Sequence, residues 1–178
     1  HADSRKKTTE YGLQLREKQK TKRIYGLQEK QFHKYYEEAE RQKGVTGANM
    51  LVLLEERLDN VVYRMGLGVS RSQARQFVNH GLITVNGKRV TIPSYQIKVG
   101  DVVSVKENKQ EQPAFVALKQ SKKAANLPKW LDFDPATLTG KVLAKPTRED
   151  IDMSIQEHMI VDIDFEIAEN LIVELYSK

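Results

Sequence analysis

Four basic side chains within residues 70–90 have types and spacing suited to binding phosphate. The stretch reads SRSQARQFVNHGLITVNGKRV. Arg71 and Arg75 are four positions apart, which places them on one face of a helix, and Lys88 and Arg89 follow a tight turn. Arginine forms paired hydrogen bonds to phosphate, and the backbone N–H groups at the start of a helix also attract anions. The spacing therefore predicts a phosphate backbone held by two adjoining elements at once.

Two further basic surfaces accompany this stretch. One covers residues 5–23, and the other is a polar stripe that contains Arg57 and Arg64. Cations that reach a polyanion release its condensed counterions, which favours binding. Two alternatives remain open at this point. The first surface is also typical of a solvated helix face, and the two arginines of the second are also placed to pair with Glu56 or Asp59.

Residues that would indicate catalysis or a bound cofactor are lacking. There is no cysteine, so disulfides and thiolate zinc sites are excluded in this chain. No glycine-rich loop of the Walker or dinucleotide-binding kind occurs. The alternating VDIDF near the end is more typical of a strand with one wet face than of an acid–base pair. The histidines show no metal-ligand spacing; they are His1, His33, His80 and His158. We therefore expect neither an enzyme, nor a metal site, nor a cofactor.

Composition and charge point to a folded protein with a polyanionic partner. The 178 residues are 39% hydrophobic and 30% charged, which suits one or two domains. Residues 1–50 hold 12 basic and 7 acidic residues, residues 51–130 hold 13 and 6, and residues 131–178 hold 4 and 11. Such asymmetry is typical of a chain whose basic part binds a polyanion. No apolar run is long enough to span a membrane and no secretory signal is present, so we expect a cytosolic address.

The basic side chains must be positioned by a series of helices. Residues 9–25 predict a helix that begins at Thr8 or Thr9 and ends at Gly26, and residues 28–43 predict a second that ends at Gly44. Residues 46–65 predict one long helix, because its main apolar side chains fall within an arc of about 100°. These side chains are Leu51, Leu54, Leu58, Val61, Val62 and Met65.

A compact helix–hairpin unit follows the long helix. Ser70 is the expected N-cap of a helix over 71–79, with Gln73 completing a capping box, and Gly81 is the expected left-handed residue at its end. Asn86-Gly87 predicts a tight hairpin turn between the strand LITV and a returning KRVTI. VVSVK predicts a further strand. Beyond it, residues 113–125 look helical, and the chain to about 145 is irregular or strand-rich.

The tail contains a local duplication. SIQEHMIVDIDF (154–165) aligns without gaps with EIAENLIVELYS (166–177), the segment that follows it directly. Two copies are too few for a repeat architecture, so a local duplication is the better interpretation.

These motifs together resemble one family. TEYGLQLREKQK, RIYG, ERLDNVVYRMG, SRSQARQFVNHGLITVNGKRVTIPSYQIKVGD and ENLIVELYSK resemble the bacterial S-four family of small-subunit ribosomal proteins. The resemblance covers residues 1 to about 145 and resumes at 166–178. Members carry one copy of the tail pattern where this chain has two. We favour the second copy for the usual position because it keeps VELYSK.

The resemblance implies an α+β fold in two parts. One is an N-terminal helical rRNA-binding domain, 1–50, completed by a C-terminal helix, 166–178. The other, 51–145, is a small α/β RNA-binding domain in which two helices pack on an antiparallel β-sheet, with a helix–helix–hairpin core at 57–106. Residues 146–165 would form an acidic tail with the duplicated segment.

The resemblance also implies a role in translation. Proteins of this family bind the 5′ domain of 16S rRNA early in small-subunit assembly, contact small-subunit proteins five and three, line the path by which mRNA enters, and influence decoding accuracy. No cofactor or membrane is implied. Some members hold a zinc ion on cysteines of an N-terminal arm, but this sequence contains no cysteine, so we expect no metal here. A stand-alone RNA-binding factor of the same domain family is the alternative. An RNA-modifying enzyme that borrows the domain would need a catalytic domain that this chain does not supply.

Three sets of residues would face RNA according to this resemblance. The set of the second domain is Arg57, Arg64, Arg71, Arg75, His80, Asn86, Lys88, Arg89, Ser94 and Tyr95. The set of the first domain is Tyr11, Lys18, Lys20, Lys22 and Arg23. The basic stretch that matches the mRNA entrance is Arg5, Lys6 and Lys7.

Overall fold

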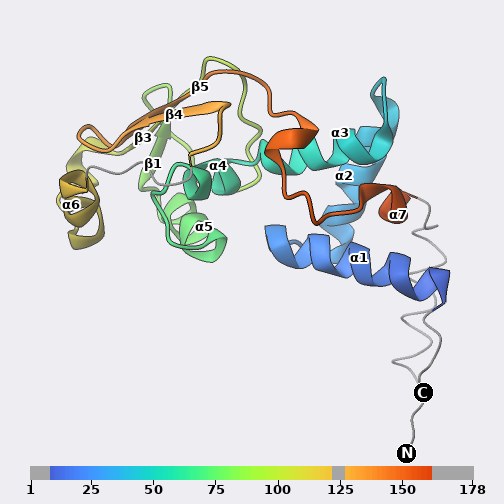
Figure 1. Ribbon diagram of the computed structural model, residues 1–178. Helices are drawn as coiled ribbons and strands as arrows, with labels where there is room; N and C mark the ends of the chain where they lie inside the picture. Colours follow the sequence, from blue (N-terminus) through green and yellow to red (C-terminus); the bar gives the residue numbers. More distant parts are fainter. Residues whose placement is uncertain (1–8, 122–126, 162–178) are drawn as a thin grey trace, which may run out of the picture. The chain divides into compact units, whose positions relative to one another are not determined.

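The computed structural model describes residues 9–121 and 127–161 (Figure 1). The chain divides into two compact units. One consists of the chain up to Leu51 together with the chain from Asp152 onward, and the other is the continuous segment Val52–Ile151.

Helices form the described part of the first unit. Helix α1 spans Glu10–Tyr25, α2 spans Glu29–Arg41, α3 spans Thr46–Glu55 and crosses the division between the units, and α7 spans Glu157–Val161. The first predicted helix is confirmed: the Thr9 hydroxyl accepts a hydrogen bond from the Gly12 N–H (3.1 Å), and Gly26 ends α1 with a φ of 70°. The second was predicted slightly too long at its end, because α2 stops at Arg41 rather than at Gly44.

Helix α7 packs against α1, although the two helices lie near opposite ends of the sequence. The Lys20 ammonium donates to the Ser154 carbonyl (2.7 Å), and the Gln156 N–H donates to a Glu17 carboxylate oxygen (2.8 Å). Gly47 of α3 allows α7 to approach α3 closely, since a Cβ at Gly47 would lie 2.9–3.0 Å from atoms of Glu157 and Val161. The buried apolar side chains of the unit include Tyr25, Phe32, Ala39, Met50, Leu51, Ile155 and Ile160.

Part of the first copy of the duplicated tail therefore belongs to the packed helical unit, because α7 lies within 154–165. The second copy and the predicted C-terminal helix 166–178 lie outside the described residues, as does the end of the helix predicted at 113–125.

The second unit is built on a five-stranded antiparallel sheet with the order β2-β1-β3-β5-β4. The strands are β1 (Ile83–Val85), β2 (Lys88–Arg89), β3 (Val102–Val105), β4 (Leu131–Asp134) and β5 (Thr139–Val142). Helices α4 (Leu58–Arg64) and α5 (Arg71–Asn79) lie side by side against it (Figure 1). The remaining elements are α6 (Pro113–Gln120) and two 3-10 turns, η1 (Glu107–Lys109) and η2 (Arg148–Asp150). The expected α+β fold class is confirmed.

One core joins the helices to the sheet. Side chains alternate along the central strands, so Ile83, Val85, Val103 and Val105 are buried. They meet apolar side chains of α4 and α5, together with Phe115 of α6 and the buried Trp130; the helical contributors are Leu58, Val61, Val62, Ala74 and Val78.

The long helix predicted over 46–65 is wrong, because the structure has two helices with a break at Glu56–Arg57. Arg57 has extended backbone angles (φ −67°, ψ 141°). The segment 93–97 satisfies the backbone groups at the break. The Leu58 N–H donates to the Tyr95 carbonyl (2.9 Å), the Asp59 N–H donates to the Pro93 carbonyl (3.1 Å), and the Ile97 N–H donates to the Glu56 carbonyl (2.9 Å). The apolar stripe continues through the break, which explains why the pattern alone did not reveal it.

The predicted hairpin turn is confirmed at Asn86-Gly87. Both residues have positive φ, 52° and 81°, as a type I′ turn requires. The Asn86 side chain holds the next strand as well: its carbonyl oxygen accepts from the Val102 N–H (2.9 Å) and its amide donates to Asp101 (3.0 Å). The returning strand is shorter than predicted, since only Lys88–Arg89 pair with β1.

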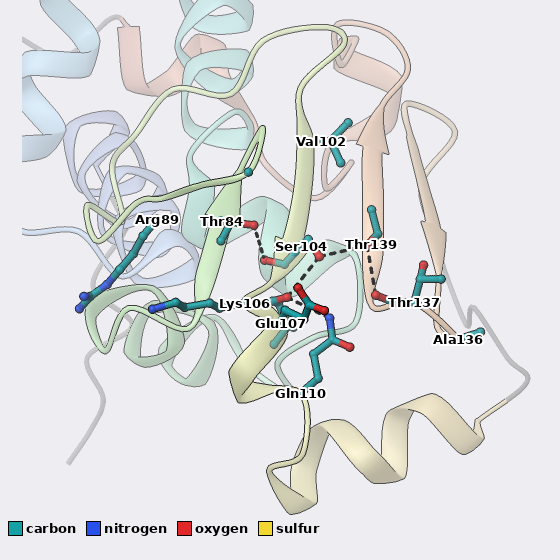
Figure 2. A pocket seen from close by; sticks show the side chains of 12 residues that line it. Thr84, Arg89, Val102, Ser104, Lys106, Glu107, Gln110, Ala136, Thr137 and Thr139 are labelled. Atoms are coloured by element: carbon teal, nitrogen blue, oxygen red, sulfur yellow. Dashed lines mark hydrogen bonds between the residues drawn. The ribbon is translucent and has the colours of Figure 1, made fainter.

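The face of the sheet opposite α4 and α5 forms an open hollow of about 730 Å³ with a mixed polar and apolar lining (Figure 2). Its floor consists of the hydroxyl residues that alternate with the buried valines and isoleucine. The Thr84 hydroxyl donates to the Ser104 carbonyl (3.4 Å), and the Ser104 and Thr139 hydroxyls lie 3.0 Å apart. Arg89 and Lys106 bring positive charge to its edge.

Gly140 in β5 is expected to be the least tolerant glycine of the sheet. A Cβ there would lie 2.5 Å from the Met65 sulfur and 2.7 Å from the Asp132 carbonyl oxygen. Gly140→Ala should therefore destabilise the second unit by about 2 kcal/mol, the usual cost of overpacking. Urea unfolding followed by the fluorescence of the buried Trp130 measures this.

Met65→Ala provides the control, because shortening Met65 removes its close contact with the added methyl group and leaves only the contact with the Asp132 carbonyl oxygen. The cost of Gly140→Ala should fall in that background. An equal cost in both backgrounds would show that the Met65 contact is not the cause.

Candidate nucleic-acid interface

Helix α5 carries Arg71 and Arg75, and both of its ends agree with the prediction from the sequence. The Ser70 hydroxyl accepts from the Gln73 N–H (3.1 Å), and Gly81 has a φ of 74° after the helix. The capping box differs in one bond: the Gln73 side-chain oxygen accepts from the Val69 N–H (2.7 Å) rather than from Ser70. This bond continues the cap one residue further back and fixes the chain that leads into the helix.

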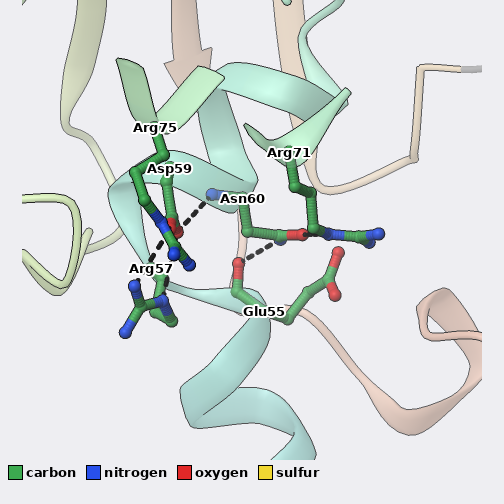
Figure 3. A network of polar contacts seen from close by, with 6 residues as sticks. All are labelled: Glu55, Arg57, Asp59, Asn60, Arg71 and Arg75. Atoms are coloured by element: carbon green, nitrogen blue, oxygen red, sulfur yellow. Dashed lines mark hydrogen bonds and ion pairs between the residues drawn. The ribbon is translucent and has the colours of Figure 1, made fainter. Parts of the chain in front are cut away.

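The arginines of α5, of α4 and of the position before α4 form one group, the arginine cluster, made of Arg57, Arg64, Arg71 and Arg75. Figure 3 shows three of them, Arg57, Arg71 and Arg75. At the centre of the cluster is Asp59, which is 2% exposed. The Arg57 guanidinium donates to both Asp59 oxygens, with Nε–Oδ1 3.1 Å and Nη2–Oδ2 2.9 Å. Arg75 donates from its Nε to Oδ2 of the same carboxylate at 3.2 Å.

Arg71 is held by a neighbouring amide. Its Nε donates to the Asn60 side-chain oxygen (2.9 Å), and its guanidinium lies 4.7 Å from the centre of the Tyr63 ring, a cation–π contact. Asn60 is 1% exposed, and its own amide donates to the Glu55 carbonyl (2.6 Å). Both acceptors that hold the α5 arginines are therefore buried.

Arg64 completes the cluster through a second buried carboxylate. Its Nε donates to a Glu55 oxygen at 2.7 Å, and Glu55 is fully buried. The ion pairs of the cluster use two buried carboxylates, Glu55 with Arg64 and Asp59 with both Arg57 and Arg75. Of the pairings left open by the sequence, that of Arg57 with Asp59 is confirmed, whereas the Arg64 pair with Glu55 was not among them.

The arginines differ in their access to solvent. Arg57 is 2% exposed, whereas 24% of the Arg64 side chain and 34% of the Arg75 side chain are exposed. Arg57 thus lies beneath the surface that the others present. Glu56, next to it, carries a carboxyl group whose pKa is raised by burial, an effect that the charge of Lys145 partly opposes.

Ser94 and Tyr95 are brought to the same end of α4. The backbone bonds from Leu58 and Asp59 to the segment 93–95 place them there, with Tyr95 38% exposed. Ser94 and Tyr95 therefore lie near Asp59 of the arginine cluster, although the segments 57–59 and 93–95 are well separated in the sequence.

The basic residues of the hairpin lie near the C-terminal end of α5, away from Arg71 at its start. Lys88 and Arg89 are exposed on β2, and the Arg89 guanidinium occupies the space that a Cβ on Gly81 would need. Arg89 therefore lies at the C-terminal end of α5, where His80 is also exposed, while Arg71 begins that helix. Simultaneous binding of one backbone by both elements remains a prediction.

The predicted residues of the first unit are partly committed to internal contacts. Lys18 is fully buried, and both Lys18 and Lys22 of α1 donate to the Glu29 carboxylate of α2. Burial alone would raise the pKa of Glu29, but the hydrogen bonds and charges of the two lysines outweigh it and hold this pKa below its ordinary value.

The remaining residues of that set are distributed along α1. Arg23 is exposed, Tyr11 is half-buried, and Lys20 bonds to Ser154 and to Glu17. The basic stretch that begins the chain lies outside the described residues: Arg5, Lys6 and Lys7.

Sequence reasoning gave no organising role to the residues that hold the cluster together: Glu55, Asp59, Asn60 and Tyr63. Asp59 was considered only as a neutralising partner, and Asn60 only as a member of the polar stripe with Arg57 and Arg64. The contact of Asp59 with Arg75 joins two different helices and depends on how α4 and α5 pack, so no spacing rule indicates it.

Within residues 9–121 and 127–161, no group of three or more histidine, aspartate or glutamate side chains is arranged to hold a metal ion. The same residues include no helix long and apolar enough to cross a membrane.

Comparison with known proteins gives matches along the whole chain. Residues 56–103 match the S4 domain family, and residues 1–55 match the Ribosomal protein S4/S9 N-terminal domain family. The chain is 56% identical over 178 residues to small ribosomal subunit protein uS4 of Ruminiclostridium cellulolyticum and 55% identical to that of Acetivibrio thermocellus. Both alignments cover 100% of this chain and 80% of the relative. The uS4 protein of Heliobacterium modesticaldum is 54% identical over 163 residues, 92% of this chain and 78% of the relative.

Proposed function

Because this chain belongs to the family of small ribosomal subunit protein uS4, we propose that it is a primary binder of the 16S rRNA 5′ domain and nucleates assembly of the small subunit there. The general role follows from membership of this family: the protein is a structural, RNA-binding component of the small ribosomal subunit and not an enzyme.

The observation that carries the proposal is the arginine cluster. All four of its arginines fall within residues 56–103, which match the S4 domain. The cluster gathers four guanidinium groups, of which those of Arg64 and Arg75 are partly exposed, and three of the four come from two helices packed side by side. Guanidinium groups fixed in this way suit a folded RNA, whose phosphates are also fixed in space.

Further partners are part of the same proposal. Small-subunit proteins five and three are the proposed protein neighbours, and mRNA near its entrance is the proposed ligand of the basic stretch 5–7. An influence on translational accuracy would follow from that location. The division into a helical rRNA-binding domain, 1–50, and an RNA-binding domain, 51–145, is likewise proposed.

Binding of the full chain to a transcript of the 16S 5′ domain tests the proposal. We expect saturable one-to-one binding in a filter assay. The affinity should fall steeply with salt, with a slope of log K against log salt of about 0.7–0.9 for each phosphate neutralised. A transcript of the 16S 3′ domain is the matched control and should bind far more weakly. Equal affinity for both transcripts would contradict the proposal.

Co-sedimentation with small subunits separates this function from that of a stand-alone RNA-binding factor. A ribosomal component should be recovered at one copy per subunit after a high-salt wash. Recovery well below one copy would favour the stand-alone factor.

A further inference from the structure

Two consecutive buried side chains at the start of α4 each hold one arginine of α5. Asp59 accepts from Arg75 and Asn60 accepts from Arg71, both at the arginine Nε atom. We propose that Asp59 and Asn60 are positioning residues, which set the two arginines for phosphate before RNA arrives. The inference rests on the proposed rRNA-binding function.

Holding an arginine at Nε fixes the direction of the whole guanidinium group. The group is planar, so an acceptor at Nε sets the plane in which its other N–H groups lie. Arg71 and Arg75 are one helical turn apart, about 6 Å along the axis. Their planes are therefore fixed relative to each other as well as to α5. In Figure 3 both side chains descend from α5 toward α4 and end beside these two acceptors.

The acceptors are themselves fixed, which is what a positioning role needs. The fork of Arg57 and the Asn60 N–H (2.7 Å) both donate to Asp59, and the Asn60 amide donates to the Glu55 carbonyl (2.6 Å). Neither residue has more than 2% of its surface exposed. Arg57 is buried with them, so we assign it to orienting Asp59 rather than to touching RNA. A side chain ordered in advance loses less freedom on binding, and this improves affinity.

Simple electrostatics predicts that removing the Asp59 carboxylate would raise the affinity for RNA, whereas a positioning role predicts that it would lower it. A carboxylate close to the phosphate-binding surface repels the ligand, so its removal should tighten binding if charge alone matters. If Asp59 positions Arg75, its removal should weaken binding although the protein becomes more positive. The sign of the change distinguishes the two readings.

Asp59→Asn in the full chain is the first test, with the 5′-domain transcript as the probe. We expect affinity to fall about tenfold and the salt slope to fall by about one, which corresponds to one lost phosphate contact. Glu111→Gln is the matched control, because it removes an exposed carboxylate of the same unit, and it should leave affinity unchanged or slightly improve it. Thermal unfolding by circular dichroism establishes that each variant is folded.

A cycle with Arg75→Gln assigns the effect to Arg75. In that background Asp59→Asn should no longer weaken binding, because the arginine that it positions is gone. An equal loss in both backgrounds, or unchanged or tighter binding by a folded Asp59→Asn protein, would overturn the inference.

Arg71→Lys combined with Arg75→Lys keeps the test decisive even where Asp59→Asn does not fold. Both lysines retain the charge but lack the planar group that is held at Nε. Positioning predicts about tenfold weaker binding, whereas charge alone predicts the affinity of the unchanged chain, and that result would refute the inference. Failure of the unchanged chain to bind the 5′ domain would refute the proposed function instead.

Discussion

Replacing Arg71 and Arg75 together with alanine is expected to weaken binding to the 16S 5′ domain by about 1–3 kcal/mol for each arginine. Both side chains are fixed at their Nε atoms by buried acceptors, so they offer RNA a prepared surface. Filter binding at several salt concentrations measures the loss. The salt slope should fall as well, because two cations leave the interface.

Arg41→Ala is the matched control. Arg41 is 73% exposed on α2 and pairs only loosely with Glu38 at 3.4 Å, so its removal should change affinity little. The fold should survive the double substitution, because Asp59 keeps the fork of Arg57. Unchanged affinity in a folded double variant would refute the role given to the arginine cluster.

Glu29→Gln is expected to destabilise the helical unit by roughly 3 kcal/mol, because it removes the shared partner of two lysines, one of them fully buried. Urea unfolding followed by far-ultraviolet circular dichroism reports on these helices. Glu38→Gln is the control: its carboxylate is 51% exposed, and an exposed pair contributes little, so the loss should stay below about 1 kcal/mol.

The destabilisation should also depend on pH in a defined direction. The lysines hold the pKa of Glu29 below its ordinary value of 4.5 in the folded protein. The stability that this carboxylate contributes is therefore complete above pH 4.5 and is lost as the pH falls through the lowered pKa. The stability difference between the unchanged chain and Glu29→Gln should shrink below pH 4.5. A difference that stays constant to lower pH would exclude the charged pair as its source.

Local signals predicted the ends of α1 and α5 and the hairpin turn well. Thr9, Gly26, Ser70 and Gly81 act through bonds to residues within a few positions, and the Asn86-Gly87 turn needs only its own backbone angles. Such interactions are encoded in short stretches, and sequence patterns capture them.

The break between α3 and α4 could not be predicted in the same way. No proline or glycine marks it, and the apolar spacing runs through Leu54, Leu58 and Val61 without interruption. The break exists because backbone carbonyls of Pro93 and Tyr95 take over hydrogen bonds that a continuous helix would make. These partners come from a distant part of the sequence and meet α4 only in the folded unit.

At the candidate site, too, contacts between residues distant in sequence could not be predicted from local patterns. The types and spacing of Arg71 and Arg75 indicated phosphate binding, but the acceptors at Asp59 and Asn60 depend on the packing of two helices. Lys18 shows the converse: it belongs to a basic run that suggested a charged surface, yet it is buried beside Glu29. Basic residues in a run become distinguishable only when their burial is known.

The two units also differ in when they can form during synthesis. Val52–Ile151 is continuous in sequence, so a growing chain contains all of it before α7 has been made. The helical unit is discontinuous, and the contacts of Lys20, Glu17 and Gly47 with the segment 154–161 must wait until that segment leaves the exit tunnel. Because domains fold as units and in the order of their emergence, we expect the sheet and the arginine cluster to be complete while α1 still lacks one of its neighbours.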